Sequence, residues 1–167
     1  SLWIGARDTG KVRQLEGVQL NGTLTASFTW ISDGRSLVCC TVPQGRGKAP
    51  VGSTTPTGPV IQENEGQIAP SRTYQDLLKN TDDEDLFEFY TTSQLALVTL
   101  NGKVTQVGCE GMVNRVDPSP DGVYLLVEMQ HRPFSYLVPS SRFPLRTEIW
   151  NMDGDVVREL ADLPLAE

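Results

Sequence analysis

The residues best suited to binding chemistry lie in one stretch of the chain, residues 131–146 (HRPFSYLVPSSRFPLR). This stretch has no Asp or Glu, although the chain as a whole is acidic, and it carries Arg132, Arg142 and Arg146, three aromatic residues and three prolines. A guanidinium offers a planar fork of N–H donors, so a stiff loop that presents arginines can bind a carboxylate. The alternative is that these arginines pair with acidic residues elsewhere, for example in a helical insertion, while the aromatic rings simply pack.

Motifs for catalysis and for metal or cofactor binding are absent from the sequence. There is no Gly-x-Ser-x-Gly nucleophile elbow, and a Ser-His-Asp triad would have to use His131, the single histidine. GRGK at 45–48 lacks the spacing of a phosphate-binding loop. Asn151, Asp153 and Asp155 imitate the start of a calcium loop, but a hairpin turn explains them better because the glycine comes too early. We therefore predict no catalytic residue, no metal site and no cofactor.

The composition excludes several other classes of protein. The chain of 167 residues has a formal net charge of −7 and no cluster of Lys and Arg, so we expect neither nucleic acid nor an anionic membrane surface as a partner. It contains no apolar run of about 18 residues, which argues against a membrane-spanning helix. Of its three cysteines, Cys39 and Cys40 are adjacent. Neighbouring side chains on a strand point to opposite faces, so these two favour buried thiols in a reducing compartment over a disulfide or a metal site.

Hairpin patterns recur along the chain and predict its fold. Three segments each combine an apolar run, a turn that ends in Gly and a second alternating run: LWIGARDTGKVRQL (2–15), LALVTLNGKVTQV (95–107) and EIWNMDGDVVREL (148–160). A second type, with Ser-Asp-Gly or Ser-Pro-Asp-Gly between strands, alternates with the first. The turns at Gly102 and Gly154 are 52 residues apart, close to the repeat of a four-stranded propeller blade. The pattern predicts a mostly β fold, a partial β-propeller of about two to three blades.

One predicted blade carries an insertion at 43–94. Residues 43–72 are rich in Pro, Gly, Ser and Thr, which indicates a loop. Residues 73–90 then change to helical spacing, and we expect two short helices there, the first capped by Thr73 and the second by Asp82. The acidic run that begins at Asp82 is interpreted as the solvated start of the second helix rather than as a cation site.

Long strings within the sequence resemble one peptidase family. The stretch TYQDLLKNTDDEDLFEFYTTSQLALVTLNGKVTQVG is similar to a propeller segment of the glutamyl endopeptidases, which are prolyl oligopeptidase-type serine peptidases of the chloroplast stroma with bacterial relatives. HRPFSYLVPSSRFPLRTEIW and VRELADLPLAE resemble the same family in the same order. The resemblance covers nearly the whole chain, is strongest over 73–167, and is weak over the loop rich in Gly and Pro.

The resemblance implies a peptidase of two domains that cleaves after glutamate. Its N-terminal propeller would admit or position peptide substrates, and a C-terminal α/β-hydrolase domain would supply Ser, Asp and His. Residues 1–167 match only part of the propeller, so we assign no catalytic residue to this chain and expect it to be inactive alone. For contact with the substrate glutamate, the resemblance and the basic stretch together point to Arg132 and Arg142, with His131 and Tyr136 as weaker contacts.

The alternative function is a non-catalytic, propeller-like module for protein interaction. Three blades at most cannot close a ring that normally needs about four to eight, and open blade edges would expose unpaired strands. The first residues already have a strand pattern, so we expect the chain to be cut from a longer protein. The family implies the chloroplast stroma for a plant or alga, and the cytoplasm or periplasm for a bacterium. The sequence indicates no oligomeric state.

Overall fold

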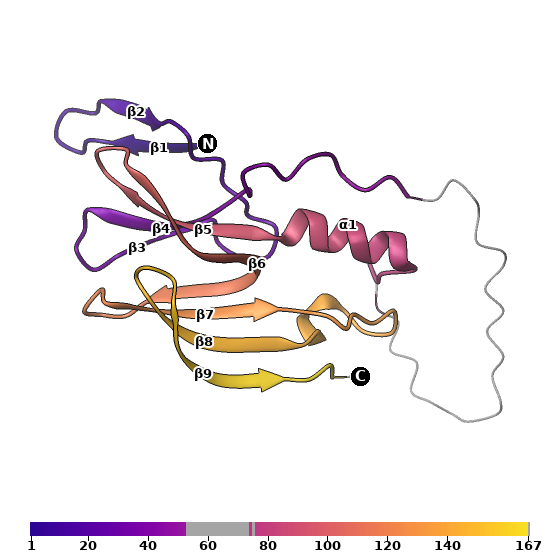
Figure 1. The fold of residues 1–167 in the computed structure, drawn as a ribbon. Helices are drawn as coiled ribbons and strands as arrows, with labels where there is room; N and C mark the ends of the chain where they lie inside the picture. The colour runs from indigo at the N-terminus through magenta and orange to yellow at the C-terminus, as the bar shows by residue number, and fades with distance from the viewer. Residues whose placement is uncertain (53–73, 75, 167) are drawn as a thin grey trace, which may run out of the picture.

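The structure is a computed structural model that describes residues 1–52, 74 and 76–166. Its elements in chain order are β1 (Leu2–Gly5), β2 (Val12–Leu15), β3 (Phe28–Trp30), β4 (Ser36–Thr41), α1 (Thr81–Thr91), β5 (Ser93–Thr99), β6 (Val104–Pro118), β7 (Tyr124–Gln130), the 3-10 turn η1 (Ser140–Arg142), β8 (Leu145–Asn151) and β9 (Val156–Leu163). Strands β1 and β2 form one small sheet, and β3 to β9 form a seven-stranded antiparallel sheet in chain order (Figure 1). The prediction of a mostly β fold is confirmed.

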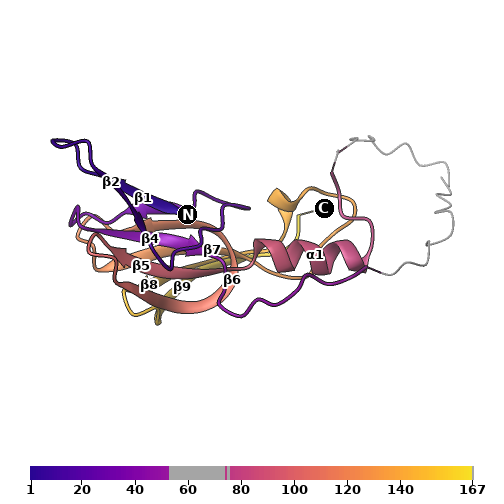
Figure 2. The same ribbon diagram turned by 90° about the horizontal axis from the view of Figure 1, so that it is seen from above.

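The seven-stranded sheet turns back on itself at β6, its longest strand. Residues 104–111 of β6 pair with β5, and residues 112–118 pair with β7. Shifts of register interrupt both pairings, and such irregularities bend a strand. The sheet is therefore curled, and its first strands face its last ones across the interior (Figures 1 and 2).

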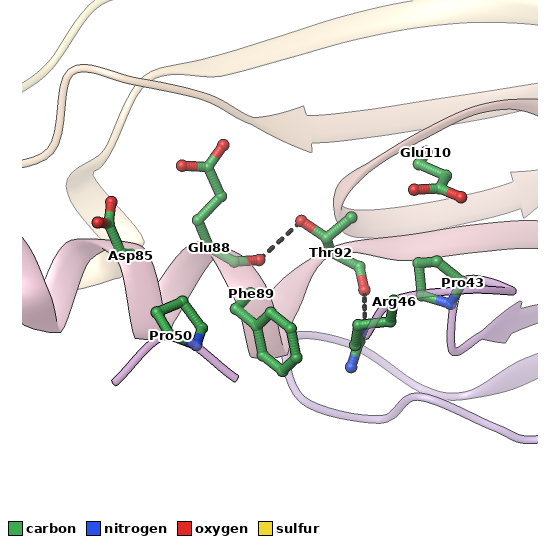
Figure 3. Close-up of a pocket in the computed structure, with 8 residues that line it drawn as sticks. All are labelled: Pro43, Arg46, Pro50, Asp85, Glu88, Phe89, Thr92 and Glu110. Carbon is green, nitrogen blue, oxygen red and sulfur yellow. Dashed lines mark hydrogen bonds between the residues drawn. The ribbon is translucent and has the colours of Figure 1, made fainter. Parts of the chain in front are cut away.

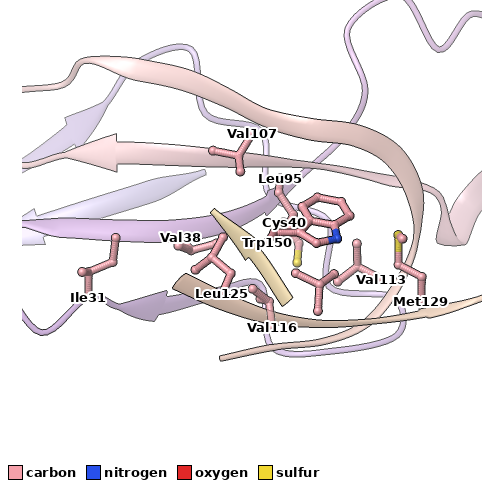
Figure 4. Packing of buried hydrophobic residues seen from close by; sticks show 11 residues of the cluster. Ile31, Val38, Cys40, Leu95, Val107, Val113, Val116, Leu125, Met129 and Trp150 are labelled. Carbon is pink, nitrogen blue, oxygen red and sulfur yellow. The ribbon is translucent and has the colours of Figure 1, made fainter. Parts of the chain in front are cut away.

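The main core fills the space between the two halves of this curled sheet. Its residues come from β4 and β5 on one side, from β7 and β8 on the other, from β6 and from the residue just after β3: Ile31, Val38, Cys40, Leu95, Val107, Val113, Val116, Leu125, Val127, Met129 and Trp150 (Figure 4). Trp150 is the largest of them and is 1% exposed. Burial of this apolar surface holds the halves together, at roughly 25 cal/mol per Å².

Strand β4 is buried on both faces, which explains its continuous run of apolar residues. Val38 and Cys40 face the main core, whereas Leu37 and Cys39 join a second core under the hairpin of β1 and β2. Burial raises the pKa of Cys39 to about 12 and that of Cys40 to about 11, so both thiols stay protonated at neutral pH. The interpretation of this pair as buried thiols is confirmed.

Helix α1 differs from the prediction in its number and in its start. The sequence predicts two short helices with Asp82 as the second cap, but the described residues contain one α-helix, whose N-cap is Asn80. Asn80 Oδ1 accepts a hydrogen bond from the backbone N–H of Asp83 at 2.8 Å, and the N–H of Lys79 donates to Asp83 Oδ2 at 2.9 Å. These bonds start the helix before Asp82, which then lies in the first turn, where negative charge is favourable. The predicted cap Thr73 lies outside the described residues.

The three hairpins of the first type form where they are predicted, as β1–β2, β5–β6 and β8–β9. In the last one, Asn151 Oδ1 accepts hydrogen bonds from the backbone N–H groups of Asp153 and Asp155 at 3.0 and 2.9 Å, so these three residues build the turn.

Across the described ranges, no helix is long and apolar enough to cross a membrane. The same ranges hold no group of three or more His, Cys, Asp and Glu that could bind a metal ion.

Candidate functional site

Two long connections meet beyond one end of the curled sheet. Helix α1 lies in the connection from β4 to β5, and residues 131–144 form the connection from β7 to β8 (Figures 1 and 2). The ring of Phe87 on α1 packs edge-on against Phe134 and Phe143, with centroid distances of 5.3 and 5.7 Å. These rings belong to a third buried cluster, which fixes the helix against the basic stretch.

Arg132 is held by three carboxylates of α1. Its Nε and Nη2 lie 2.8 Å from Glu88 Oε2, its Nη2 lies 3.0 Å from Asp85 Oδ1, and its Nη1 donates to Glu84. The guanidinium carbon also lies 4.7 Å from the centroid of the Phe134 ring. This pairing between the basic stretch and the helical insertion is the alternative that the sequence left open.

We expect Arg132→Ala to loosen α1, because three neighbouring carboxylates then lose their shared counter-charge. Hydrogen–deuterium exchange of the amides in the helix should become several-fold faster, whereas exchange in β7 should not change. The matched control is Arg142→Ala, since within the described residues the Arg142 side chain forms a single hydrogen bond, to the Ala166 carbonyl oxygen at 3.4 Å, and no ion pair. Equal protection of α1 in both variants would contradict this role of Arg132.

The His131 ring lies between two oxygen acceptors. Its Nδ1 is 2.6 Å from the backbone oxygen of Arg132, and its Nε2 is 2.8 Å from Asp162 Oδ1 on β9. A carbonyl and a carboxylate accept hydrogen bonds, so these surroundings favour the protonated ring, in which both nitrogens donate. The bond with Asp162 raises the pKa of His131 above its ordinary value of 6.5. When it is protonated, the ring adds positive charge beside Arg132.

This bond makes stability depend on pH in a defined direction. Because the pKa of His131 is raised in the folded protein, the stabilisation is complete below about pH 6.5 and is lost as the pH rises through the folded pKa. In Asp162→Asn we expect the pKa of His131 to fall toward 6.5 and the pH-dependent loss of stability to shrink. Titration of the His131 ring protons by NMR measures the first effect, and urea unfolding on both sides of that pH measures the second. An unchanged pKa in the variant would show that Asp162 is not the cause.

The other two predicted residues, Tyr136 and Arg142, lie on the same connection but have different surroundings. A hydrogen bond with Glu84 raises the pKa of Tyr136, so Tyr136 and Arg132 share one carboxylate of α1. Arg142 ends the short turn η1 and lies beside Ala166, after β9. The structure thus places Tyr136 with Arg132 at the helix and leaves Arg142 apart from them.

A pocket of about 390 Å³ lies where α1 and strands β6, β7 and β8 meet. His131 and Arg132 line it together with Glu88, Glu110 and Arg146. The sequence interpretation placed Arg146 in the basic stretch but did not select it as a contact. Arg146, Glu148 and Trp150 occupy alternate positions of β8, so strand periodicity is the signal that could have assigned Arg146 to the face of a buried carboxylate.

The Arg146 side chain reaches that buried carboxylate. Glu148 Oε2 accepts a hydrogen bond from Trp150 Nε1 at 2.7 Å, and Glu148 Oε1 lies 3.0 Å from Arg146 Nε. A buried charge is costly unless it is paired and hydrogen-bonded, and Glu148 has both an ion pair with Arg146 and a hydrogen bond from Trp150.

A second pocket of about 360 Å³ adjoins the first, because both are lined by Glu88, Thr92 and Glu110. Figure 3 shows its residues, with apolar Pro43, Pro50 and Phe89 beside the acidic ones. Arg46 donates from Nη2 to the Thr92 carbonyl oxygen, and its guanidinium carbon lies 5.3 Å from the Phe89 ring centroid. The sequence predicts a loop around Arg46. No local pattern indicates that its side chain contacts Phe89 and Thr92, which lie much later in the chain.

Comparison with known proteins relates the chain to two plant sequences. It is 45% identical over 170 aligned residues to a protein of Oryza sativa subsp. japonica, and 44% identical over 170 to one of Arabidopsis thaliana; both are named "Probable glutamyl endopeptidase, chloroplastic". The alignments cover 99% of this chain but only 18% of each relative, so the chain spans less than a fifth of their length. No family profile matches the chain, and no solved structure does. The resemblance stated from the sequence is confirmed.

Proposed function

We propose that this chain is a propeller segment of a serine endopeptidase that cleaves peptides after glutamate, and that it admits and positions substrates for a hydrolase domain outside these residues. The observation that carries the proposal is the 44–45% identity, over 99% of the chain, to two proteins named as probable glutamyl endopeptidases. Both relatives are named as chloroplastic, so we also propose a chloroplast location for the parent protein.

The strand arrangement supports the propeller part of this proposal. A blade is a four-stranded antiparallel sheet that packs face to face on its neighbours. Strands β3, β4, β5 and the first part of β6 would be one such unit, and the second part of β6 with β7, β8 and β9 would be another. The hairpin of β1 and β2 packs on the free face of the first unit and would be part of a third blade.

The connections at one end of the sheet support the substrate role. In both four-stranded units the long connection joins the second strand to the third, so the two connections emerge on the same side, where His131 and Arg132 line a pocket. We propose that this side faces the hydrolase domain. Direct contact between Arg132 and a substrate carboxylate requires the substrate to displace one of the three carboxylates that Arg132 already binds.

The test is cleavage by the full-length protein that contains these residues. Peptides that are identical except for Glu, Gln or Asp at one position are incubated with it, and products are identified by mass spectrometry. We expect cleavage after Glu, little after Gln, and inhibition by a phosphonylating reagent that attacks active-site serines. Absence of cleavage, or cleavage with no preference for Glu, would refute the proposed function.

The predicted contacts of Arg132 and Arg142 are tested in the same assay. If either arginine binds the substrate glutamate, its alanine variant loses rate on the Glu peptide but keeps its low rate on the Gln peptide. A Glu-to-Gln ratio that stays unchanged in both variants would remove these two residues from the substrate site.

A further inference from the structure

The guanidinium of Arg146, in the pocket of about 390 Å³, has N–H donors that no other described side chain uses. The Nε of Arg146 lies 3.0 Å from Glu148 in an ion pair that lacks the alignment of a hydrogen bond. Within the described residues, its two terminal nitrogens form no ion pair or hydrogen bond. The Arg146 side chain is 39% exposed, so these terminal nitrogens are within reach of a ligand. Arg132, by contrast, already directs its Nε and both terminal nitrogens to carboxylates.

The position of Arg146 is set by the sheet rather than by a loop. It lies on β8 opposite Met129 of β7, and Glu148, two residues further on, forms an ion pair with its Nε from the core. A planar guanidinium whose Nε is buried beside a carboxylate still offers its two terminal nitrogens, and such a fork can bind a second carboxylate through two parallel hydrogen bonds.

The charges around Arg146 are mixed, and most of them are already paired. His131 is close enough for its charge to act on Arg146, and it is paired with Asp162. Glu88 is paired with Arg132. That leaves Glu110, which among the described residues has no ion-pair partner and lines both pockets.

We propose that the 390 Å³ pocket binds the carboxylate of an acidic side chain in an extended peptide, and that the terminal nitrogens of Arg146 hold it. This inference rests on the proposed function and names the residue that selects glutamate. The adjoining 360 Å³ pocket, with Pro43, Pro50 and Phe89, takes an apolar neighbour of the acidic residue. Glu110 opposes the bound carboxylate by repulsion.

The test measures binding separately from cleavage. Two fluorescent peptides that differ only in Glu or Gln are titrated into the full-length protein after treatment with a serine-directed phosphonylating reagent. We expect the wild-type protein to bind the Glu peptide more tightly, and Arg146→Gln to weaken that binding about tenfold or more while the Gln peptide is unaffected. Glu110→Gln should strengthen binding of the Glu peptide.

Controls separate loss of the fork from loss of the fold. Arg158→Gln removes an exposed arginine of β9 that lines neither pocket, and it should leave both affinities unchanged. Arg146→Lys keeps a charge beside Glu148 but lacks the fork, and the double variant Arg146→Gln, Glu148→Gln leaves no unpaired buried carboxylate. Both should lose the preference for Glu while unfolding at nearly the wild-type temperature.

The outcomes distinguish this inference from the proposed function. If wild-type protein binds both peptides equally, or if the Arg146 variants keep the preference for Glu, the pocket does not select a carboxylate. A different outcome is that untreated wild-type protein fails to cleave after Glu, while the treated protein still prefers the Glu peptide and Arg146→Gln removes that preference. In that case the proposed function is wrong and the carboxylate site stands.

Discussion

Replacing Gly154 with alanine is expected to destabilise the folded protein by more than about 3 kcal/mol. Gly154 lies in the turn between β8 and β9 with φ at +91°, a region that favours glycine. A Cβ there would lie 1.8 Å from the backbone nitrogen of Gly108 and 2.3 Å from its Cα. Since these are main-chain atoms of β6, no side chain can rotate away, and the turn must lift off the strand.

Gly102→Ala is the matched control for this prediction. Gly102 occupies the equivalent turn between β5 and β6 with nearly the same φ, +92°, but a Cβ there meets no atom within 4 Å. The free energy of unfolding of Gly102→Ala should therefore fall only by the cost of the backbone conformation, about 1 kcal/mol. Urea unfolding of the two variants measures the difference. Equal destabilisation would mean that the turn after β8 does not press on β6.

Predictions from the sequence succeeded where the deciding interactions are local. The turn at Asn151 forms through hydrogen bonds to Asp153 and Asp155, within four residues of the chain, so its sequence pattern was sufficient. The assignment of Cys39 and Cys40 to opposite faces follows from the alternation of one strand.

Predictions were incomplete where two local signals competed. Asn80 and Asp82 are both good N-caps, and the reciprocal bonds of Asn80 and Asp83 with the backbone decide in favour of the earlier one. Propensity alone does not rank the two.

The site depends on distant pairs, and these were the hardest to predict. Arg132 and Glu88 are 44 residues apart, and their contact exists because two connections emerge at the same end of the sheet. The composition of the basic stretch therefore indicated a carboxylate partner, but it could not distinguish a substrate from α1. In the same way, the pairing of β7 with β8 positions Arg146 at the pocket, and no sequence motif predicts that pairing.

Trp150→Ala is expected to have the second large effect and to lower the free energy of unfolding by about 3–5 kcal/mol. Trp150 is 1% exposed and lies in the main core, between the halves of the curled sheet (Figure 4). Its ring also packs directly against Gly108 of β6, where a Cβ added to the glycine would lie 2.2 Å from Trp150 Cζ3. Loss of the indole leaves a cavity and removes the N–H donor from Glu148, so a buried carboxylate becomes under-paired.

Trp150→Phe separates these two costs. Phenylalanine keeps most of the apolar bulk but cannot donate to Glu148, so we expect roughly 1–3 kcal/mol of destabilisation. Adding Glu148→Gln to Trp150→Phe should recover part of that loss, because the unpaired charge is then gone. Thermal and urea unfolding of the three variants measure these differences.

The size of the Trp150→Ala effect bears directly on the propeller proposal. In a propeller, neighbouring blades are joined mainly by the apolar side chains between them, and Trp150 is the largest such side chain between the two halves of the curled sheet. Its loss should therefore speed hydrogen–deuterium exchange in strands of both units, β4 and β5 as well as β7 and β8. Faster exchange confined to β7 and β8 would mean that the two units do not depend on each other for stability, contrary to face-to-face packing of blades.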